Sequence, residues 1–548
     1  MLFFPRLKAF AHKHPGPSIL ITLAFAILLG AALYGFNAPF VFGHLGYHGG
    51  EYSTRARHTL HNGIFLPSNM PGHSYPGDAS LYLHHPILTH HLVTLTFALL
   101  GEHEYTVRLA ALIATLAMSA AFCALLLQQA GPWPAALGSL LFNLIPLHLW
   151  YGTHIDAGFP GIACVLVFFY FYFQFWEAQR PRSALYALLA LALACGFDWA
   201  PYLIAVPAGF HTLYGAYRKR GRSIAFVPLF ALALLLPLAL HFLAVVKTGH
   251  IAEMKAQYAA RTVPMDPSVY FKRIFVYAQA YFGIPLIAVT TAWIPIAAFR
   301  LLRGKAKLMD LAGLGFLVAF AFYVLWFKDG VMTHGYRMMY GGVSAAWASI
   351  DICLSAAALL SPFVSKRRAG FLFALLSLGI VALLLPLSWS GLLESRAHQG
   401  IPDWKTFNPY IERSAFAREL QSASKTGDML YIHRLFPIDR MELAFYMNRD
   451  QKRGFVLTGA FALKPGERAK ALLVFPRYGL HPKEEAALAE LRKQYAYYQV
   501  DAFAWIDMRE DKVSSSLLTL KKKGEAERSL WDKYWNGPYP WPELVGKP

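Results

Sequence analysis

Long apolar runs alternate with short polar links from the beginning of the chain to about residue 390. A helix needs about 20 apolar residues to cross the hydrocarbon core of a bilayer, so each run of this length predicts one membrane span. Around Asp198 a charge and Pro201 interrupt one apolar stretch, which fits either a helical hairpin or a single broken helix. The pattern predicts eleven spans, at residues 18–37, 106–128, 132–150, 158–177, 183–198, 200–216, 223–246, 279–299, 309–327, 339–361 and 369–390.

The pattern changes after residue 390. Charged residues become more frequent, and residues 483–495, rich in Ala, Glu, Leu and Lys, predict a helix. We expect a small α/β domain in 391–548, ending in a tail rich in Trp and Pro, and a transmembrane domain in 1–390. Loop 38–105 belongs to the transmembrane domain, with short interfacial helices at 51–62 and 87–100. Short strands are predicted at Met429–His433, Phe455–Thr458, Ala471–Phe475 and Ala502–Met508.

Composition supports a polytopic α-helical membrane protein. Hydrophobic residues make up 56% of the chain and charged residues 15%, whereas soluble globular proteins carry about 25% charged residues. The formal net charge of +19 does not indicate nucleic-acid binding, because the basic residues form short clusters between the apolar spans. The chain also lacks a nucleotide-binding motif, which argues against an ATP-driven pump and against a cytoplasmic nucleotide-sugar enzyme.

The basic clusters predict the orientation of the chain. With eleven spans all five clusters fall on one side, which the positive-inside rule makes cytoplasmic. The first apolar run then acts as an uncleaved signal-anchor, and the protein lies in the cytoplasmic (inner) membrane with its C-terminal domain in the periplasm or its equivalent. The clusters are Arg6/Lys8/Lys13, Arg180/Arg182, Arg218/Lys219/Arg220/Arg222, Arg300/Arg303/Lys305/Lys307 and Lys366/Arg367/Arg368.

The first outer loop carries a dense polar cluster. Glu51, Arg55 and His58 would share one face of a helix. One interpretation is a solvated interfacial helix with an ion pair between residues four apart. The other, which Gly49-Gly50 favours, is a turn that presents Glu51 at the start of a helix.

Further polar residues stand at the outer ends of predicted spans. The run His84-His85-Pro86-Ile-Leu-Thr-His90-His91 fits phosphate-contacting or interfacial histidines better than a zinc site, because its spacing is not that of helical metal ligands. Asp156 and Asp198 are carboxylates close to membrane depth, which are functional candidates by default. Alternatively these acids lie in the interface or pair with Arg108 or Lys247.

The order of several motifs resembles the GT-C superfamily of integral membrane glycosyltransferases, in its protein O-mannosyltransferase and aminoarabinose transferase branch. The resemblance spans roughly residues 15–390 and implies a polyprenyl-phosphate–sugar donor and an active site at the outer membrane face. The matching pieces are Glu51-Tyr-Ser-Thr-Arg55-Ala-Arg57, His84-His85-Pro86, Ala98-Leu-Leu-Gly101, Val107-Arg108-Leu109, Gly196-Phe-Asp198-Trp199-Ala-Pro and Thr333-His334-Gly-Tyr336-Arg337.

The chain departs from this family at one position. Most members place an Asp three or four residues before the Tyr that matches Tyr52, where this chain has His48 and Gly49. Glu51 replaces that acid, or Asp156 is the base, or catalytic competence has been lost. A single carboxylate beside a histidine is also a poor Mg²⁺ site, so a divalent metal is left open.

The resulting hypothesis is a glycosyltransferase that moves a sugar to a lipid, glycan or protein acceptor in the cell envelope. Glu51 would be the general base, with Asp156 orienting the sugar or acceptor. A transporter or lipid flippase and a non-catalytic membrane assembly protein are the alternatives. The donor phosphate and sugar would be bound by Arg55, Arg57, His84, His85, Lys328, His334, Tyr336 and Arg337.

Overall fold

The computed structural model divides the chain into two compact units, residues 1–37 with 82–396 and residues 38–81 with 397–548. Loop 38–105, predicted to belong to the transmembrane domain, is therefore divided between the two units. Helix α18 also continues to Ala397, beyond the expected boundary at 390. The structure describes residues 10–509 except 35, 38–39, 41–43, 64–65, 68–80, 84, 219–222, 263–264, 398–415, 418–419, 426, 435–449, 477–479 and 501–502.

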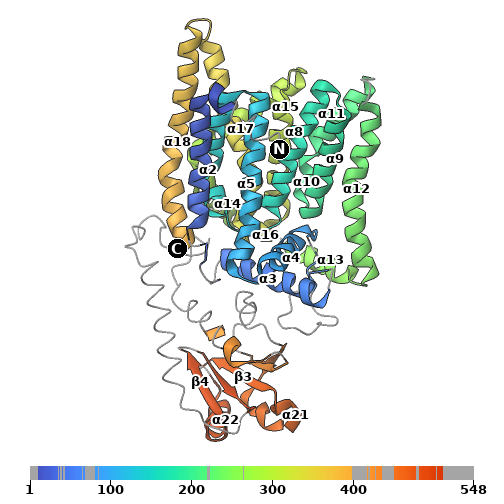
Figure 1. Cartoon of the computed structure of the whole chain (residues 1–548), viewed down its shortest axis with the longest axis vertical. Coiled ribbons are helices and arrows are strands. Elements are labelled where there is room, and N and C mark those ends of the chain that lie inside the picture. Colours follow the sequence, from blue (N-terminus) through green and yellow to red (C-terminus); the bar gives the residue numbers. More distant parts are fainter. Residues whose placement is uncertain are drawn as a thin grey trace. The chain divides into compact units, whose positions relative to one another are not determined.

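The first unit is a bundle of helices (Figure 1). Among the described residues, eight helices are long and apolar enough to cross a membrane. Large apolar side chains on their outer surfaces are exposed in the isolated chain, as expected where lipid replaces water as the solvent. These helices are α2 (Pro15–Leu33), α5 (Glu104–Gln129), α8 (Gly158–Ala178), α12 (Ser223–Lys247), α14 (Pro267–Leu302), α15 (Leu308–Trp326), α17 (Tyr340–Leu360) and α18 (Lys366–Ala397).

The other three predicted spans are shorter or broken helices, so the count of eleven stays a prediction. Residues 132–150 form α6 (Pro132–Asn143) and α7 (Pro146–Trp150), because Pro146 cannot continue the first helix. Residues 183–198 form α9 (Pro181–Phe197), which ends at Asp198. Beyond Asp198 the chain forms α10 (Ala200–Ile204) and α11 (Val206–Tyr217) as separate helices.

Four short elements of the first unit join the membrane helices on the side where the candidate site lies. The predicted helix at 87–100 is confirmed as α4 (Leu88–Leu100). The others are α13 (Ile251–Arg261), α16 (Lys328–Thr333) and the 3₁₀ helix η1 (Gly335–Met339), which leads directly into α17.

An ionic cluster around the buried Asp310 and Asp351, here called the distal clamp, ties α14, α15 and α17 together. Arg300 Nη2 donates to Asp310 Oδ1 at 2.7 Å and to Asp351 Oδ2 at 2.6 Å, and Lys307 pairs with Asp351 Oδ1. Trp293 Nε1 also donates to Asp351, at 3.2 Å. Two carboxylates face two cations, so the clamp is electrically balanced. The sequence pattern showed Arg300 and Lys307 only as part of a basic cluster.

The described C-terminal part of the second unit is a five-stranded mixed sheet with strand order β2-β1-β3-β5-β4. Strand β1 (Met429–His433) pairs in parallel with β2 (Asp450–Phe455) and β3 (Ala471–Pro476). Strands β4 (Ala496–Val500) and β5 (Phe503–Asp507) continue the sheet antiparallel. Between β2 and β3 lie η2 (Leu457–Ala462) and α21 (Pro465–Arg468), and α22 (Pro482–Gln494) connects β3 to β4.

The sequence pattern located most of these elements. The strands at Met429–His433, Ala471–Phe475 and Ala502–Met508 and the helix at 483–495 are confirmed within a residue or two. The strand predicted at Phe455–Thr458 is wrong, because β2 ends at Phe455 and η2 follows. Strand β4 was not predicted. The predicted Trp- and Pro-rich tail lies outside the described residues.

Helix α3 (His44–Asn62) in the second unit contains the polar cluster of the first loop. The predicted helix at 51–62 is confirmed but begins earlier, so Glu51 lies in its second turn rather than at its start. Gly49 and Gly50 are helical. A Cβ atom on Gly49 would lie 2.3 Å from the Phe40 ring, so glycine permits close packing here instead of a flexible turn.

Candidate active site

Two buried carboxylates stand at the beginnings of helices in the first unit. Asp156 precedes α8, and its Oδ1 accepts a hydrogen bond from Gly158 N at 3.1 Å. Asp198 stands between α9 and α10, and its Oδ1 accepts from Trp199 N at 2.8 Å. Both residues are almost completely buried, at 1% and 0% exposure. Backbone N–H groups at a helix start satisfy part of each negative charge.

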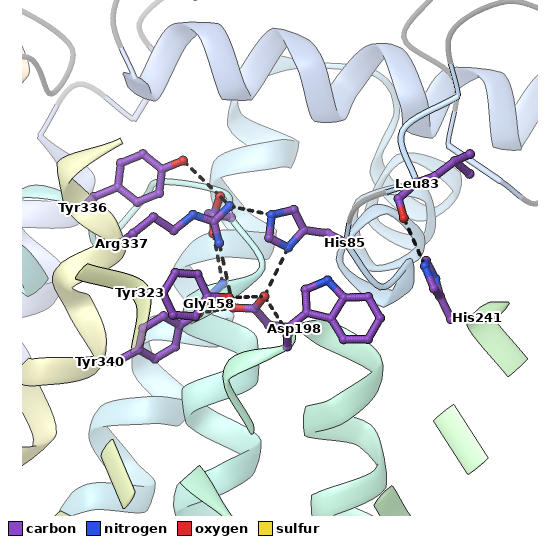
Figure 2. A network of polar contacts seen from close by, with 11 residues as sticks. Leu83, His85, Gly158, Asp198, His241, Tyr323, Tyr336, Arg337 and Tyr340 are labelled. Atoms are coloured by element: carbon purple, nitrogen blue, oxygen red, sulfur yellow. Dashed lines mark hydrogen bonds and ion pairs between the residues drawn. The ribbon is translucent and has the colours of Figure 1, made fainter. Parts of the chain in front are cut away.

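Arg337 joins the two carboxylates. Its Nη2 donates to Asp156 Oδ2 at 3.2 Å, and its Nη1 lies 3.2 Å from Asp156 Oδ1 as an ion-pair contact. Asp198 Oδ2 is 3.8 Å from Nη1. The approach of η1 to α8 depends on Gly158, because a Cβ atom there would lie 2.3 Å from Met339 Sδ. Figure 2 shows Arg337 among these side chains.

His85 completes the network from the segment before α4. Its Nδ1 lies 3.2 Å from Asp198 Oδ1, and its Nε2 lies 3.1 Å from Arg337 Nη2. Because the guanidinium can only donate, Nε2 must accept and the proton sits on Nδ1, which donates to Asp198. Burial and the nearby Arg337 charge lower the pKa of His85 against the opposing effect of Asp198. The imidazole is therefore neutral at pH 7.

Three tyrosines supply the remaining hydrogen bonds. Tyr336 Oη donates to Asp156 Oδ2 at 3.2 Å, and Tyr323 Oη donates to Asp198 Oδ1 at 3.3 Å. Tyr340 Oη donates to Asp198 Oδ2. With these bonds both carboxylates accept several donors, so they are better suited to holding Arg337 than to removing a proton from a substrate.

An aromatic layer extends from Asp156 away from His85. The Tyr336 ring lies 5.5 Å from Tyr151 and 4.5 Å from His154 between ring centroids. Tyr151 Oη is 3.4 Å from Tyr281 Oη, and Tyr281 stacks on Tyr277 in α14. Buried rings with hydroxyl groups present both flat apolar faces and polar edges, the two features of a sugar ring.

The structure brings together four of the residues predicted from the sequence, namely His85, Asp156, Tyr336 and Arg337. The predicted alternative pairing of Asp156 and Asp198 with Arg108 or Lys247 is wrong. Both acids instead contact Arg337, and Arg108 Nη1 donates to the Phe36 carbonyl at 2.8 Å.

Other predicted residues lie apart from this network or at its edge. The His334 ring is 5.6 Å from Tyr336. Lys328 Nζ instead lies over the Tyr270 ring, 5.9 Å from its centroid. His84 lies outside the described residues.

The predicted base belongs to the second unit. Glu51 pairs with Arg55, as the spacing of four residues indicated, and its Oε2 lies 3.1 Å from His48 Nδ1. The interpretation of this face as a solvated interfacial surface is wrong, because Glu51, Arg55 and His58 are buried. His58 Nδ1 bonds Asn62 Nδ2 at 3.0 Å.

Sequence reasoning missed Tyr323 and Tyr340 as members of the site. Both stand inside apolar spans, where the pattern gives no sign that one face meets a carboxylate. Among the described residues, no three His, Cys, Asp or Glu side chains converge as a metal site would require. Of the histidines in the His84–His91 run, His85 contacts Asp198 and stacks on Tyr82, and His90 packs edge-on against the same Tyr82 ring.

Comparisons with known proteins indicate the fold of the chain and the family that part of it resembles. The family model for dolichyl-phosphate-mannose-protein mannosyltransferase matches residues 84–246, a segment that contains His85, Asp156 and Asp198. No curated protein matches the sequence. Among solved structures, ArnT from Cupriavidus metallidurans in the apo state has a TM-score of 0.56 at 14% identity, over 89% of this chain and 97% of that chain.

A second ArnT structure from the same organism, bound to undecaprenyl phosphate, has a TM-score of 0.54 at 14% identity, over 92% of this chain and 99% of that chain. The fold is therefore that of an integral membrane glycosyltransferase. The resemblance of the sequence to the GT-C superfamily is confirmed: the chain has the GT-C fold, and its family model and structural neighbours are glycosyltransferases.

Proposed function

We propose that the protein transfers a sugar from a polyprenyl-phosphate-linked donor to an acceptor at the outer face of the membrane. The observation that supports this most is Arg337, buried between Asp156 and Asp198 at the start of a membrane helix. A buried charge in a membrane protein is costly and is a functional candidate by default. The similar fold of an ArnT structure bound to undecaprenyl phosphate supports the class of donor.

In this proposal Arg337 stabilises the negative charge on the departing phosphate, which needs no proton but does need a fixed cation. Asp156 and Asp198 hold Arg337 in position, and neutral His85 braces it from the side. His334 and Lys328, on the segment leading to Arg337, are further candidates for contacts with the donor. Tyr336 and the aromatic layer would receive the sugar.

We assign the general base to Glu51, with Arg55 and Arg57 as further donor contacts. A base must accept a proton from the acceptor hydroxyl or amine within hydrogen-bond reach. In the described structure the Glu51 carboxylate is paired with Arg55 and His48. The basic clusters support an orientation with α3 and the C-terminal sheet outside the cytoplasm.

The test is sugar transfer by the purified protein in proteoliposomes. Undecaprenyl phosphate carrying labelled mannose or labelled aminoarabinose is supplied together with a cell-envelope extract as the source of acceptors. The labelled product and the released undecaprenyl phosphate are both measured. Release of the free carrier lipid together with the product distinguishes a transferase from a flippase, which would move the intact donor without cleaving it.

Glu51→Gln should lower transfer by about a hundredfold or more, the contribution of a positioned general base, with membrane insertion unchanged. Glu490→Gln is the matched control, because Glu490 is an exposed acid paired with Lys493 in the C-terminal sheet domain. Full activity of the Glu51 variant would reject Glu51 as the base. Absence of donor cleavage by the unmodified protein with both sugars would count against the proposed function itself.

A further inference from the structure

The end of α17 and the beginning of α18 form a hairpin, here called the distal hairpin, that extends past the distal clamp (Figure 1). Asp351 in α17 contacts Arg300 and Lys307 close to the points where α14 ends and α15 begins. Helix α17 continues for nine residues beyond Asp351, from 352 to 360. At a rise of about 1.5 Å per residue this adds roughly 14 Å.

The surface of the distal hairpin is strongly apolar. Leu359, Phe363 and Phe371 are 74%, 83% and 69% exposed. Three large apolar side chains so close together at the end of a helical hairpin would be unfavourable in water. Something therefore covers this end of the protein.

The exposed apolar face continues without interruption along α18. Leu375, Leu383 and Trp389 are exposed at 55%, 64% and 60%, and they belong to the surface that a membrane span presents to lipid. Buried residues of α18 form a separate stripe, formed by Ala369, Phe373, Ser377, Val381 and Leu384. The distal hairpin thus extends the membrane-facing surface itself, which favours lipid over a separate protein as the occupant.

Basic residues at the tip define the kind of lipid. Arg367 and Arg368 are exposed at the start of α18, next to Lys366 in the sequence. The apolar window of α18, Arg367–Leu392, has 26 residues, which is about 39 Å of helix against a hydrocarbon core of about 30 Å. A span of this length must tilt or must lie in a locally thicker bilayer. In either case the arginines at its end lie at the level of the lipid headgroups.

We propose that the distal hairpin is a binding site for anionic phospholipids. The arginines would pair with the lipid phosphates, while Leu359, Phe363 and Phe371 would lie against the upper part of the acyl chains. The site stands at the opposite end of α17 from Arg337, so it is independent of the proposed sugar transfer and of its substrates.

The first test measures lipid preference. The full-length protein is reconstituted in an equal mixture of phosphatidylglycerol and phosphatidylcholine, purified, and its retained lipids are quantified. Phosphatidylglycerol should be enriched over the mixture. Each basic residue near an anionic surface contributes about 1 kcal/mol of lipid attraction, and tenfold in affinity corresponds to about 1.4 kcal/mol. The double variant Arg367→Gln/Arg368→Gln should therefore lower the affinity for phosphatidylglycerol by up to about thirtyfold.

Arg180→Gln/Arg182→Gln is the matched control, because it removes two exposed arginines from the α8–α9 turn. This control should keep the enrichment. Equal enrichment in the hairpin variant and the unmodified protein, or an equal loss in both variants, would overturn the proposal.

The second test reports the surroundings of the tip. Phe363→Cys is labelled with an environment-sensitive fluorophore, and the unmodified chain, in which Cys123, Cys195 and Cys353 are buried and Cys164 is partly buried, supplies the background. Emission should shift to shorter wavelength in vesicles that contain phosphatidylglycerol, and less so after Arg367→Gln/Arg368→Gln. Emission typical of water in every vesicle would show that lipid does not cover the tip.

Discussion

Two ionic networks share helices α15 and α17 and lie at opposite ends of the bundle. The distal clamp joins α14, α15 and α17 through Asp310, Asp351, Arg300 and Lys307. The candidate active site joins the C-terminal end of α15 and the N-terminal end of α17 to α8 and α9. Both networks contain two buried aspartates and one arginine, and the distal clamp adds Lys307, whose side chain is 45% exposed.

The networks differ in charge balance. In the distal clamp two carboxylates meet two cations, and every carboxylate oxygen has a donor, so the arrangement is complete as it stands. In the part of the candidate site that the structure describes, two carboxylates meet one guanidinium, because folding keeps His85 neutral. Tyrosine hydroxyls supply the remaining donors. A balanced network is sufficient for stability, whereas the unbalanced one retains a net negative charge that a proton or a cation can neutralise.

The largest effect should come from Arg337→Gln. It removes the one permanent cation of the network in Figure 2, so sugar transfer should fall by about a hundredfold to a thousandfold, as when a preorganised stabiliser of developing charge is lost. Transfer in proteoliposomes measures this, with thermal unfolding followed in parallel. Arg337→Lys retains the charge but not the several guanidinium contacts, and it should recover part of the activity. If Arg337→Gln lowers the stability but leaves sugar transfer unchanged, the network around Arg337 is purely structural, as the distal clamp is.

The distal clamp should respond in the opposite way. Asp351→Asn leaves Arg300 and Lys307 without one of their two carboxylates, which should lower the free energy of unfolding by about 3 kcal/mol or more. Transfer per folded molecule should change little, because no substrate contact lies there. Denaturant or thermal unfolding and transfer assays on the same preparation provide both values. A loss of transfer as large as that of Arg337→Gln would contradict the structural role of the clamp.

Acidification should weaken the candidate site. Folding lowers the pKa of His85 below its ordinary value of 6.5, so below that pH the unfolded chain binds the proton more readily and the folded state loses stability. One such group contributes at most about 1.4 kcal/mol per pH unit. Between pH 7 and pH 5, His85→Asn should show a shallower loss of stability than the unmodified protein. Identical slopes would mean that His85 does not titrate in this way.

The smallest effect is expected from Tyr340→Phe. It removes one donor to Asp198, while Trp199 N–H and His85 still bond that carboxylate, so transfer should fall by the equivalent of about 1 kcal/mol. Tyr172→Phe is the control, because Tyr172 is a buried tyrosine of α8 whose hydroxyl bonds Ala208 O, His211 and Thr212. An equal loss of transfer in both variants would remove the special role assigned to the Asp198 hydrogen bonds.

The amino-acid sequence by itself determined where the main elements lie. Apolar length located the eight long helices, because the need to bury backbone hydrogen bonds in lipid makes each long apolar run a helix. Alternation and helical composition likewise located β1, β3, β5 and α22. The prediction was less accurate where a proline or a short element decides the result, as in α6–α7 and in β2 with η2.

Only the tertiary structure decided which polar residues act together. Arg337 meets Asp156 and His85 across 181 and 252 positions of the chain, and no local periodicity encodes such a contact. The sequence indicated Asp198 as an acid at membrane depth, but it did not indicate the partners of this carboxylate. Asp351 lies in a predicted apolar span, and nothing in the sequence indicated its ion pairs. The reason is physical: apolar burial is additive along one helix and visible in sequence, whereas an ion pair depends on the packing of several helices at once.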